Sequence, residues 1–365
     1  MTTTKNNEHK KLNVPNLRFQ EFEGEWTEHT LGDISEFSKE RLNSKELSCD
    51  NYVATENMLQ DYQGIVTASN IPSNTNVIKF SKGDVLLSNI RPYLKKVWYA
   101  DRDGGCSADV FVFKALAVCD TDFLHYIIAN DRFINFTMSG AKGVKMPRGD
   151  KEQMKTYKIG LPSKEEQRKI ANLLRLLDER IATQNKVINR LQSLIKGIAN
   201  KSFHVARETK PLLEFAPNIT SGNDKNGSGT IPLYGSTGII GMVKNASQKG
   251  NIVLVARVGT IGTVQFVNEP CGVSDNALII EAGDMTKYIY YFLKTYNFAR
   301  ITSGTTQPLI TASSLKKIAI PIFDIERSSN IVRCLSGLEK KLNIEKRYLL
   351  DMVMIKQYLL RQMFI

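Results

Sequence analysis

Basic side chains are concentrated in one short stretch of the chain. Between positions 142 and 158 the cations are Lys142, Lys145, Arg148, Lys151, Lys155 and Lys158. Only Asp150 and Glu152 oppose them there. The whole chain carries a net charge of +12 at pH 7, so a polyanion such as nucleic acid is the first partner to consider. A solvated face is the alternative interpretation of such a stretch.

Catalytic motifs are missing from the sequence. No G-x-x-x-x-G-K-[ST] segment is present to hold a triphosphate, and no Asn-Pro or Asp-Pro pair introduces an adenine-methyltransferase site. No acidic cluster suits a divalent ion, because Asp178-Glu179 and its counterpart Glu339-Lys340 are expected on a solvated helix edge. The run GSTGIIG at 235–241 lacks the context of a nucleotide loop and predicts a tight turn. We therefore expect no catalysis by this chain alone.

Cysteine and histidine are placed for neither disulfides nor metal binding. The five cysteines stand far apart without a C-x-x-C pair, and the four histidines never fall at ligand spacing. We therefore expect no metal site and a reducing, cytoplasmic location. No apolar run approaches the ~20 residues of a membrane span, so no membrane partner is expected. Residues 1–11 are polar and predict a disordered tail rather than an export signal.

An internal repeat spans nearly the whole chain. The pattern of residues 170–203 recurs without a gap at an offset of 161 as residues 331–364. Shorter matches lie upstream: Leu161-Pro162 with Ile320-Pro321, Ser139-Gly140 with Ser303-Gly304, Arg91 with Arg257, and Asp109 with Asp275. The chain is thus a tandem duplication in the order globular, helix, globular, helix.

Both helical segments carry a heptad seam. Steps of four and three residues select eight large apolar side chains in nine positions from Ile170, and seven in nine from Ile331. This period predicts a two-stranded antiparallel coiled coil, with two ordinary core helices as the alternative. Full overlap would place the polar exceptions, Gln184 and Glu345, against each other, whereas an offset seam would leave both in water. The predicted seam residues are Ile170, Leu174, Leu177, Ile181, Gln184, Ile188, Leu191, Leu335, Leu338, Leu342, Glu345, Leu349 and Met352.

The rest of the chain predicts mixed secondary structure. Apolar runs at 84–90, 109–114, 252–256 and 277–280 predict strands, and 123–129 and 288–293 predict short helices. The expected fold class is α+β: two mixed α/β domains separated by two long antiparallel coiled-coil helices, with an internal pseudo-twofold repeat. After the tail of residues 1–11, the expected boundaries are 12–160 for domain 1, 161–205 for the central helical spacer, 206–320 for domain 2 and 321–365 for the C-terminal helical spacer.

The doubled motif pattern resembles a known family. It consists of Ser-Gly, an apolar residue before Pro, E-Q or E-R, and I-x3-L-x2-L-[DE]-x2-[IL], and it occurs from Ser139 to Ile181 and again from Ser303 to Leu342. In this doubled form it is similar to the specificity subunit of type I restriction–modification systems, over about residues 12–365. The loop SGAKGVKMP of the first copy departs from the family pattern more than SGTTQPLI of the second.

The resemblance implies a division of labour. The two globular parts would be target-recognition domains, each reading half of a bipartite double-stranded DNA target, and the helices would set their distance and dock methyltransferase (modification) subunits. S-adenosylmethionine, ATP and Mg would act on those subunits and on restriction (endonuclease/translocase) subunits, with no cofactor in this chain. The alternatives are a nucleic-acid enzyme with a degenerate site, a coiled-coil interaction protein, and another two-headed DNA-binding protein without restriction partners.

The duplication also sorts the candidate DNA-binding residues. Side chains identical in both copies, Arg91 with Arg257 and Asp109 with Asp275, cannot distinguish two half-sites, so they predict phosphate contacts or structural ion pairs. Base reading is expected where the copies diverge, since Arg and Lys pair with guanine edges and Asn and Gln with adenine. The predicted base-contacting residues are Asn89, Tyr93, Lys95, Lys96, Lys142, Lys145 and Arg148 in domain 1, and Thr260, Thr305, Thr306 and Gln307 in domain 2.

Overall fold

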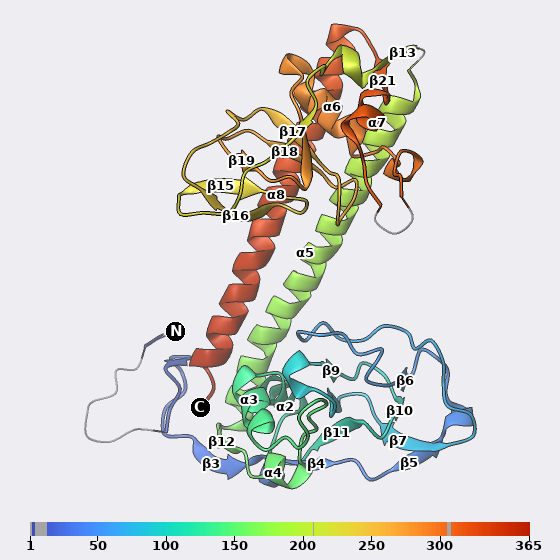
Figure 1. The fold of residues 1–365 in the computed structure, drawn as a ribbon. Helices are drawn as coiled ribbons and strands as arrows, with labels where there is room; N and C mark the ends of the chain where they lie inside the picture. Colours follow the sequence, from blue (N-terminus) through green and yellow to red (C-terminus); the bar gives the residue numbers. More distant parts are fainter. Residues whose placement is uncertain (1, 4–12, 207, 305–307) are drawn as a thin grey trace. The chain divides into compact units, whose positions relative to one another are not determined.

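The chain folds into two compact units. The computed structural model describes residues 2–3, 13–206, 208–304 and 308–365 (Figure 1). Unit 1 comprises Met1–Thr183 with Leu349–Ile365, and unit 2 comprises Gln184–Tyr348. The two long helices, α5 (Lys164–His204) and α8 (Ile325–Gln362), therefore each contribute one part to unit 1 and the other part to unit 2.

Unit 1 contains two four-stranded sheets, in the orders β4-β11-β8-β9 and β5-β7-β10-β6. Their strands are β4 (Ser35–Phe37), β5 (Arg41–Asn43), β6 (Tyr52–Val53), β7 (Asn76–Phe80), β8 (Val85–Ser88), β9 (Val97–Tyr99), β10 (Gly104–Cys106) and β11 (Val110–Ala115). All neighbours pair antiparallel except β6 and β10, which are parallel.

Both faces of the first sheet are covered, which explains the continuous apolar runs of β8 and β11. Leu86 and Val112 pack into one core cluster with Trp98, whereas Leu87 and Phe113 pack into another with helix α2. A strand buried on both faces has no polar alternation to maintain. The helices and strands around this core are β3 (Thr27–Thr30), α1 (Leu31–Ile34), α2 (Thr121–Ile128), α3 (Asp131–Ser139), α4 (Lys151–Lys155) and β12 (Lys158–Leu161).

Unit 2 repeats this topology. Its sheet β14-β20-β17-β18 has the same order as β4-β11-β8-β9, and a three-stranded sheet β16-β15-β19 retains one parallel pair, β15 with β19. The elements are β13 (Glu208–Pro211), β14 (Thr220–Ser221), β15 (Ile231–Tyr234), β16 (Ile239–Val243), β17 (Ile252–Ala256), β18 (Val264–Val267), β19 (Gly272–Val273), β20 (Ala277–Ile280), α6 (Thr286–Leu293), α7 (Ala312–Lys316) and β21 (Ala319–Ile322). Of the segment 235–241, predicted as a tight turn, residues 235–238 join β15 to β16 and residues 239–241 belong to β16; Gly235 N donates to Gly238 O at 2.8 Å.

In each unit the strand that precedes a long helix pairs with an earlier strand. In unit 1, β3 pairs antiparallel with β12, and in unit 2, β13 pairs antiparallel with β21. The expected boundaries at 160/161 and 320/321 therefore fall inside β12 and β21. Of the tail expected at residues 1–11, the described part is β1 (Thr2–Thr3), which pairs with β2 (Leu17–Arg18).

The long helices pack against each other in both units, and none of the predicted seam residues is exposed. In unit 1 the first turns of α5, with Ile170 and Leu174, share a core with Leu359 near the end of α8. In unit 2 the predicted polar pair is formed. Gln184 Nε2 donates to Glu345 Oε2 at 2.6 Å and to the backbone oxygen of Glu345 at 3.1 Å. These contacts make the packing antiparallel within each unit.

The expectation that Asp178 lies on a solvated edge is wrong. Tyr126 Oη, from α2, donates to Asp178 Oδ2 at 2.9 Å, and Lys356 Nζ, from α8, lies 2.5 Å from Asp178 Oδ1. Burial, together with the negative charge of Asp178, raises the pKa of Tyr126. The Asp178 carboxylate on α5 thus connects this helix to both α2 and α8 in unit 1.

The same expectation is wrong for Glu339. Tyr290 and Tyr291, from α6, donate to its two carboxylate oxygens at 2.8 Å each, and Lys294 Nζ lies 2.8 Å from Oε1. Burial opposes ionisation of Glu339, but the hydrogen bonds from Lys294 and the two tyrosines hold its pKa below the usual value. The duplication has therefore preserved a tyrosine–carboxylate fastening between short helix and long helix. Neither these helices nor any other described helix combines the length and apolar character that a bilayer crossing requires.

Candidate nucleic-acid interface

The chain turns sharply where β8 leaves the core of unit 1. Asn89 N donates to Asp109 O at 2.8 Å, and Arg91 N donates to Pro147 O at 2.8 Å. Arg91 has φ of 52°, in the left-handed region that non-glycine residues rarely occupy. Backbone strain of this kind is retained where the surroundings determine it, and it concentrates at functional sites. Here the hydrogen bond from Arg91 N to Pro147 O holds the strained backbone conformation of Arg91.

A narrow loop is attached at this turn. Lys142 N donates to Arg148 O and Arg148 N donates to Lys142 O, each at 2.9 Å, while Ile90 forms a β-bridge with Arg148. These pairings hold residues 142–148 against the segment that follows β8. The structure thus brings together Asn89, Arg91, Lys142 and Arg148, which the sequence predicted as DNA-binding. Lys145 lies in the exposed part of the same loop.

Two cations of this loop, Lys142 and Arg148, form ion pairs that are exposed to solvent. Lys142 Nζ lies 2.6 Å from Asp150 Oδ2 and Arg148 lies 3.2 Å from Asp109, but both basic side chains are mostly exposed. Exposed pairs of this kind contribute little to stability, so exchanging their partners for phosphate costs little. Among the described residues, no carboxylate lies within ion-pair distance of Lys145.

Arg91 and Arg257 both follow a core strand, β8 and β17, but the backbone hydrogen bonds make Asn89, not Arg91, the structural counterpart of Arg257. Arg257 N donates to Asn276 O at 2.9 Å, as Asn89 N does to Asp109 O in unit 1. The predicted ion pairs with Asp109 and Asp275 are not formed within the described part of the chain, where Asp109 pairs with Arg148 instead. The Nε atoms of both arginines are buried without a hydrogen-bond partner, and so is Asn89 Oδ1. Buried polar atoms left unpaired are costly and require an explanation, such as an absent ligand.

Lys95 and Lys96 are engaged within unit 1. Lys95 Nζ lies 2.9 Å from Asp131 Oδ1, which also accepts a hydrogen bond from Tyr62 Oη at 2.9 Å. Although burial opposes ionisation of Asp131, the hydrogen bond from Lys95 leads the contributions that lower its pKa. Lys96 Nζ donates to the backbone oxygen of Thr55 at 2.6 Å. These two lysines therefore position neighbouring loops, whereas Tyr93 is exposed.

The corresponding residues of unit 2 are only partly described. Thr260 is exposed in the turn after β17, and its Oγ1 donates to Ser236 O at 3.3 Å. Thr305, Thr306 and Gln307 lie outside the described residues. The residues that flank them, Ser303 and Leu309, exchange two backbone hydrogen bonds of 3.0 and 2.8 Å, as Lys142 and Arg148 do in unit 1. Both units therefore hold the two ends of a loop beside the segment that follows a core strand, and in unit 2 Ile310 N donates to Arg257 O at 3.0 Å.

Sequence reasoning missed the tyrosine–carboxylate fastenings and the Tyr62–Asp131–Lys95 contact. The repeat did contain a signal for the fastenings, because Tyr126 precedes Asp178 as Tyr290 precedes Glu339, in both cases by about fifty residues. Within the ranges that the structure describes, no three His, Cys, Asp or Glu side chains are grouped as a metal site would need.

Comparison with known proteins matches both halves of the chain. A family model described as the type I restriction modification DNA specificity domain matches residues 23–193 and 208–351. The type I restriction enzyme EcoDI specificity subunit from Escherichia coli is 28% identical over 129 residues, which are 34% of this chain and 29% of that protein. The alignments cover between 29% and 62% of the length of three curated relatives.

Two solved structures share the fold. The crystal structure of a type I restriction–modification S subunit from M. genitalium aligns with a TM-score of 0.69 and 19% identity, covering 96% of this chain and 99% of that one. A chain from a structure described as the basis of complex assembly and conformational transition of the type I R-M system aligns with a TM-score of 0.57 and 19% identity, covering 92% and 96%.

Proposed function

The chain belongs to the type I restriction–modification DNA specificity family, whose model matches most of its length, and from this premise we propose that it recognises a bipartite double-stranded DNA target within a type I complex. Residues 12–160 and 206–320 act as the two target-recognition domains. The segments 161–205 and 321–365 act as helical spacers. The chain itself transfers no methyl group and cuts no strand.

The observation that carries this proposal is that each unit has an arginine with a buried, unpartnered Nε just after a core strand. Arg91 and Arg257 each follow a core strand, and each lies beside a loop attached by backbone hydrogen bonds. A residue common to both domains suits the part of DNA that is common to both half-sites, which is the phosphate backbone. The attached loops differ between the copies, so we assign base reading to them. In domain 1 the loop offers Lys142, Lys145 and Arg148.

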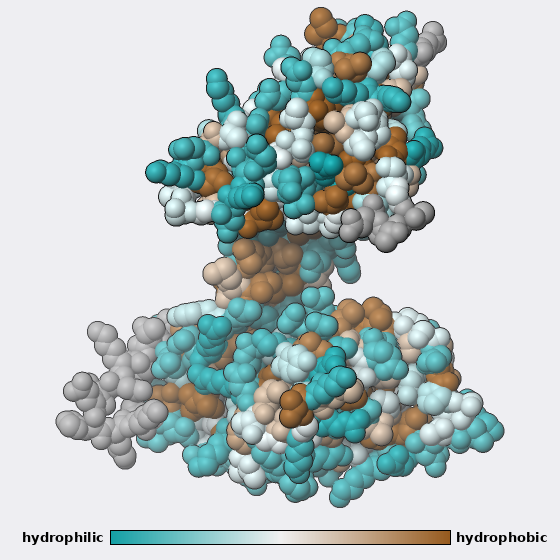
Figure 2. All heavy atoms as spheres, in the orientation of Figure 1, coloured by the Kyte–Doolittle hydropathy of each residue, from teal (hydrophilic) through white to brown (hydrophobic). Residues whose placement is uncertain are grey.

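We assign the cofactors of the reaction to partner subunits. Methyltransferase subunits would supply S-adenosylmethionine, and restriction subunits would supply ATP-driven, Mg-dependent cleavage. One of the similar structures concerns complex assembly in a type I system, which supports such partners. Helix α8 offers them apolar surface, because Ile344, Met354, Ile355 and Tyr358 are all more than half exposed. Hydrophobic side chains are visible at the surface over the long helices (Figure 2). Exposed apolar surface of this kind indicates a protein contact.

The test begins with the methylation pattern of the host genome. Sequencing that detects methylated adenine gives a candidate bipartite motif, and a duplex carrying it is titrated with the chain and its methyltransferase subunits. We expect tight binding that weakens steeply as salt rises from ~0.05 to ~0.2 M, because phosphate contacts release counterions. A coiled-coil interaction protein would give no binding at any salt concentration. Methylation or cleavage by the isolated chain, supplied with Mg, ATP and S-adenosylmethionine, would contradict the assignment of catalysis to partners.

A further inference from the structure

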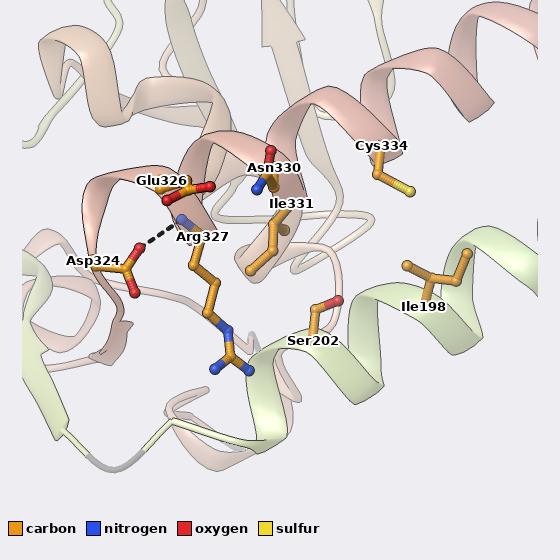
Figure 3. Close-up of a pocket in the computed structure, with 8 residues that line it drawn as sticks. All are labelled: Ile198, Ser202, Asp324, Glu326, Arg327, Asn330, Ile331 and Cys334. Atoms are coloured by element: carbon orange, nitrogen blue, oxygen red, sulfur yellow. Dashed lines mark hydrogen bonds between the residues drawn. The ribbon is translucent and has the colours of Figure 1, made fainter.

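One open pocket of unit 2 does not suit a polyanion. It lies between the end of α5 and the start of α8 and has a volume of about 450 Å³ (Figure 3). Its lining contains two carboxylates, Asp324 and Glu326, but only one cation, Arg327. The loop at 142–148 in unit 1 has the opposite charge, because its charged side chains are all basic. DNA contact is therefore to be expected at this loop rather than at the pocket.

The loop has a counterpart in unit 2 that is closed in the same way. Lys142 and Arg148 exchange two backbone hydrogen bonds, and so do Ser303 and Leu309. Corresponding residues of the two pairs are 161 positions apart, which is also the offset between the starts of α5 and α8. Each loop therefore holds five residues between its paired ends.

The first and last of these five residues are the same in both loops. Gly143 has φ of 95° and Gly304 has φ of 91°, a region that glycine enters without strain. Pro147 and Pro308 stand at the other end, and proline fixes its own φ. The structure therefore matches Gly304 with Gly143, whereas the sequence repeat matched it with Gly140. Glycine and proline give the two loops one common frame.

The three residues inside the frame differ in chemistry. In unit 1 they are Val144, Lys145 and Met146, whereas the sequence has Thr-Thr-Gln at 305–307, outside the described residues. Phosphate contacts position a protein on DNA, and base contacts specify the sequence. A common frame with different contents is the arrangement that two domains with different half-sites require.

The tip of the loop in unit 1 is apolar although it faces solvent. Val144 is fully exposed, and Met146 is 48% exposed. Lys142 and Arg148, at the base of the loop, have side chains that are 82% and 54% exposed, and Lys145 lies between the two apolar residues. Covering a fully exposed valine with an apolar group removes its methyl groups from water, which is favourable. The loop thus offers DNA an apolar tip between basic side chains.

The apolar group that distinguishes a DNA base is the C5 methyl of thymine. It lies in the major groove, whereas the minor groove presents only hydrogen-bonding groups of the bases. The major groove is about 12 Å wide and admits a two-stranded β-ribbon. The loop at 142–148 is closed across its base by paired backbone groups, as a β-ribbon is, so its tip can reach the base edges there.

We propose that the loop at 142–148 enters the major groove of the half-site read by domain 1, and that Val144 selects a thymine there by packing its methyl groups against the C5 methyl of the base. The inference rests on the proposed function and names a base contact that one recognition domain makes. The basic side chains beside Val144 attract the loop to the duplex. Because Val144 belongs to domain 1, its contribution is confined to one half-site.

The test uses the full chain with its methyltransferase subunits and the target duplex found by methylation sequencing. Each thymine of the two half-sites is replaced singly by uracil, which lacks only the C5 methyl, and affinities are measured by fluorescence anisotropy. We expect one replacement, in one half-site, to weaken wild-type binding about fourfold, the factor for one buried methyl group. Val144→Ala should weaken binding to the unmodified duplex at least about as much. In Val144→Ala the same uracil should change the affinity less than about 1.5-fold, because the two methyl partners are coupled.

The matched control is Val118→Ala, which truncates an exposed valine of unit 1 ahead of α2. It should leave both the affinity and the uracil effect unchanged. The inference fails if no single uracil weakens binding, or if the uracil effect persists in Val144→Ala. In either case a steep salt dependence of wild-type binding would leave the proposed function standing. A wild type without salt-sensitive binding to the unmodified duplex would contradict the proposed function itself, and the inference with it.

Discussion

For Arg91 and Arg257, which the sequence repeat matches, the two predicted roles were phosphate contacts and structural ion pairs. Their Nε atoms are buried and lack partners, and the predicted carboxylate partner Asp109 is paired with Arg148 instead. A guanidinium that the fold positions but leaves without a hydrogen-bonded carboxylate can bind the phosphate of a ligand. In the proposed function both domains would contact the same phosphate backbone, so the residue type can be the same in both.

Replacing either arginine should therefore weaken binding without changing sequence preference. We expect Arg91→Gln and Arg257→Gln each to reduce affinity for the target duplex about tenfold at ~0.1 M salt, and to lower the salt slope by about one. Fluorescence anisotropy titrations at several salt concentrations measure both quantities. Lys201→Gln, at an exposed position of α5, is the control and should change neither. A change confined to one half-site's base preference would assign these arginines to base reading.

His125 predicts a pH dependence of unit 1. Its ring lies between Tyr99 and Tyr126, at centroid distances of 5.2 and 4.8 Å, and its Nδ1 is buried without a partner. Burial, with a smaller contribution from the charge of Lys356, lowers the pKa of His125 from 6.5 to about 3. Below about pH 6.5, His125 is therefore protonated in the unfolded chain, whereas in the folded chain it stays neutral down to about pH 3. Stability is lost as the pH falls through this window.

The loss at pH 5.5 should be about 1 kcal/mol relative to pH 7.5, and most of it should disappear in His125→Phe. Urea unfolding monitored by circular dichroism at the two pH values measures the difference. His204→Phe, at an exposed position, is the control and should retain the wild-type pH dependence. An unchanged pH dependence in His125→Phe would assign the acid sensitivity to carboxylates instead.

At the scale of single residues, the sequence indicated candidate DNA-contacting residues of domain 1 but not which of their cations are engaged within the fold. Asn89, Arg91 and the 142–148 loop come together because Arg148 pairs with Ile90, which lies between the first two. Lys95 and Lys96 looked equivalent to the loop lysines in the sequence. Their partners, Asp131 and Thr55, lie about forty residues away along the chain, and such contacts leave no local pattern.

At the scale of elements, the heptad seam was predictable because its period is local. The same period placed Gln184 and Glu345 at the centre of each copy, and antiparallel packing then brings them together at 2.6 Å. The position of Asp178 and Glu339 was predicted wrongly for the opposite reason. If the two long helices packed alone, these carboxylates would face water. Instead, tyrosines from α2 and α6 donate hydrogen bonds to Asp178 and Glu339.

The Gln184–Glu345 pair should specify register in unit 2 at a cost in stability. Gln184→Leu alone leaves the carboxylate of Glu345 without its donor, and we expect a loss of about 1–2 kcal/mol. The double variant Gln184→Leu/Glu345→Leu removes both polar groups and should unfold at a higher temperature than the wild type. A double-mutant cycle by thermal unfolding measures the coupling. A double variant less stable than either single variant would show that the hydrogen bond stabilises the seam rather than specifying it.

At the scale of the whole molecule, the repeat predicted both the class of the fold and the equivalence of its halves. Strand order could not be predicted, because a repeat shows that two parts are alike without showing how either one folds. The repeat nevertheless identified the places where the copies differ. Residues 144–146, for example, differ from residues 305–307 inside the same frame of glycine and proline.

Domain exchange is the sharpest test of the duplicated architecture, and the structure indicates where to cut. The expected boundary at residue 320 falls inside β21, which pairs with β13 from Glu208↔Ile322 to Pro211↔Ala319. An exchange of residues 206–323 keeps both strands together, and the core strands β17 and β20 travel with it. It also carries the 303–309 loop and Arg257, so every DNA contact proposed for domain 2 moves as one body.

We expect the hybrid, together with its methyltransferase subunits, to direct methylation to a target in which one half-site has changed and the other has not, with methylation-sensitive sequencing as the measurement. The phosphate contacts survive, because any donor domain of the family that carries an arginine equivalent to Arg257 supplies them. The donor must also provide tyrosines opposite Glu339, since a half-buried carboxylate without donors would loosen α6 from α8. A hybrid lacking them should regain stability on Glu339→Leu. If both half-sites changed together, the two domains would not read DNA independently.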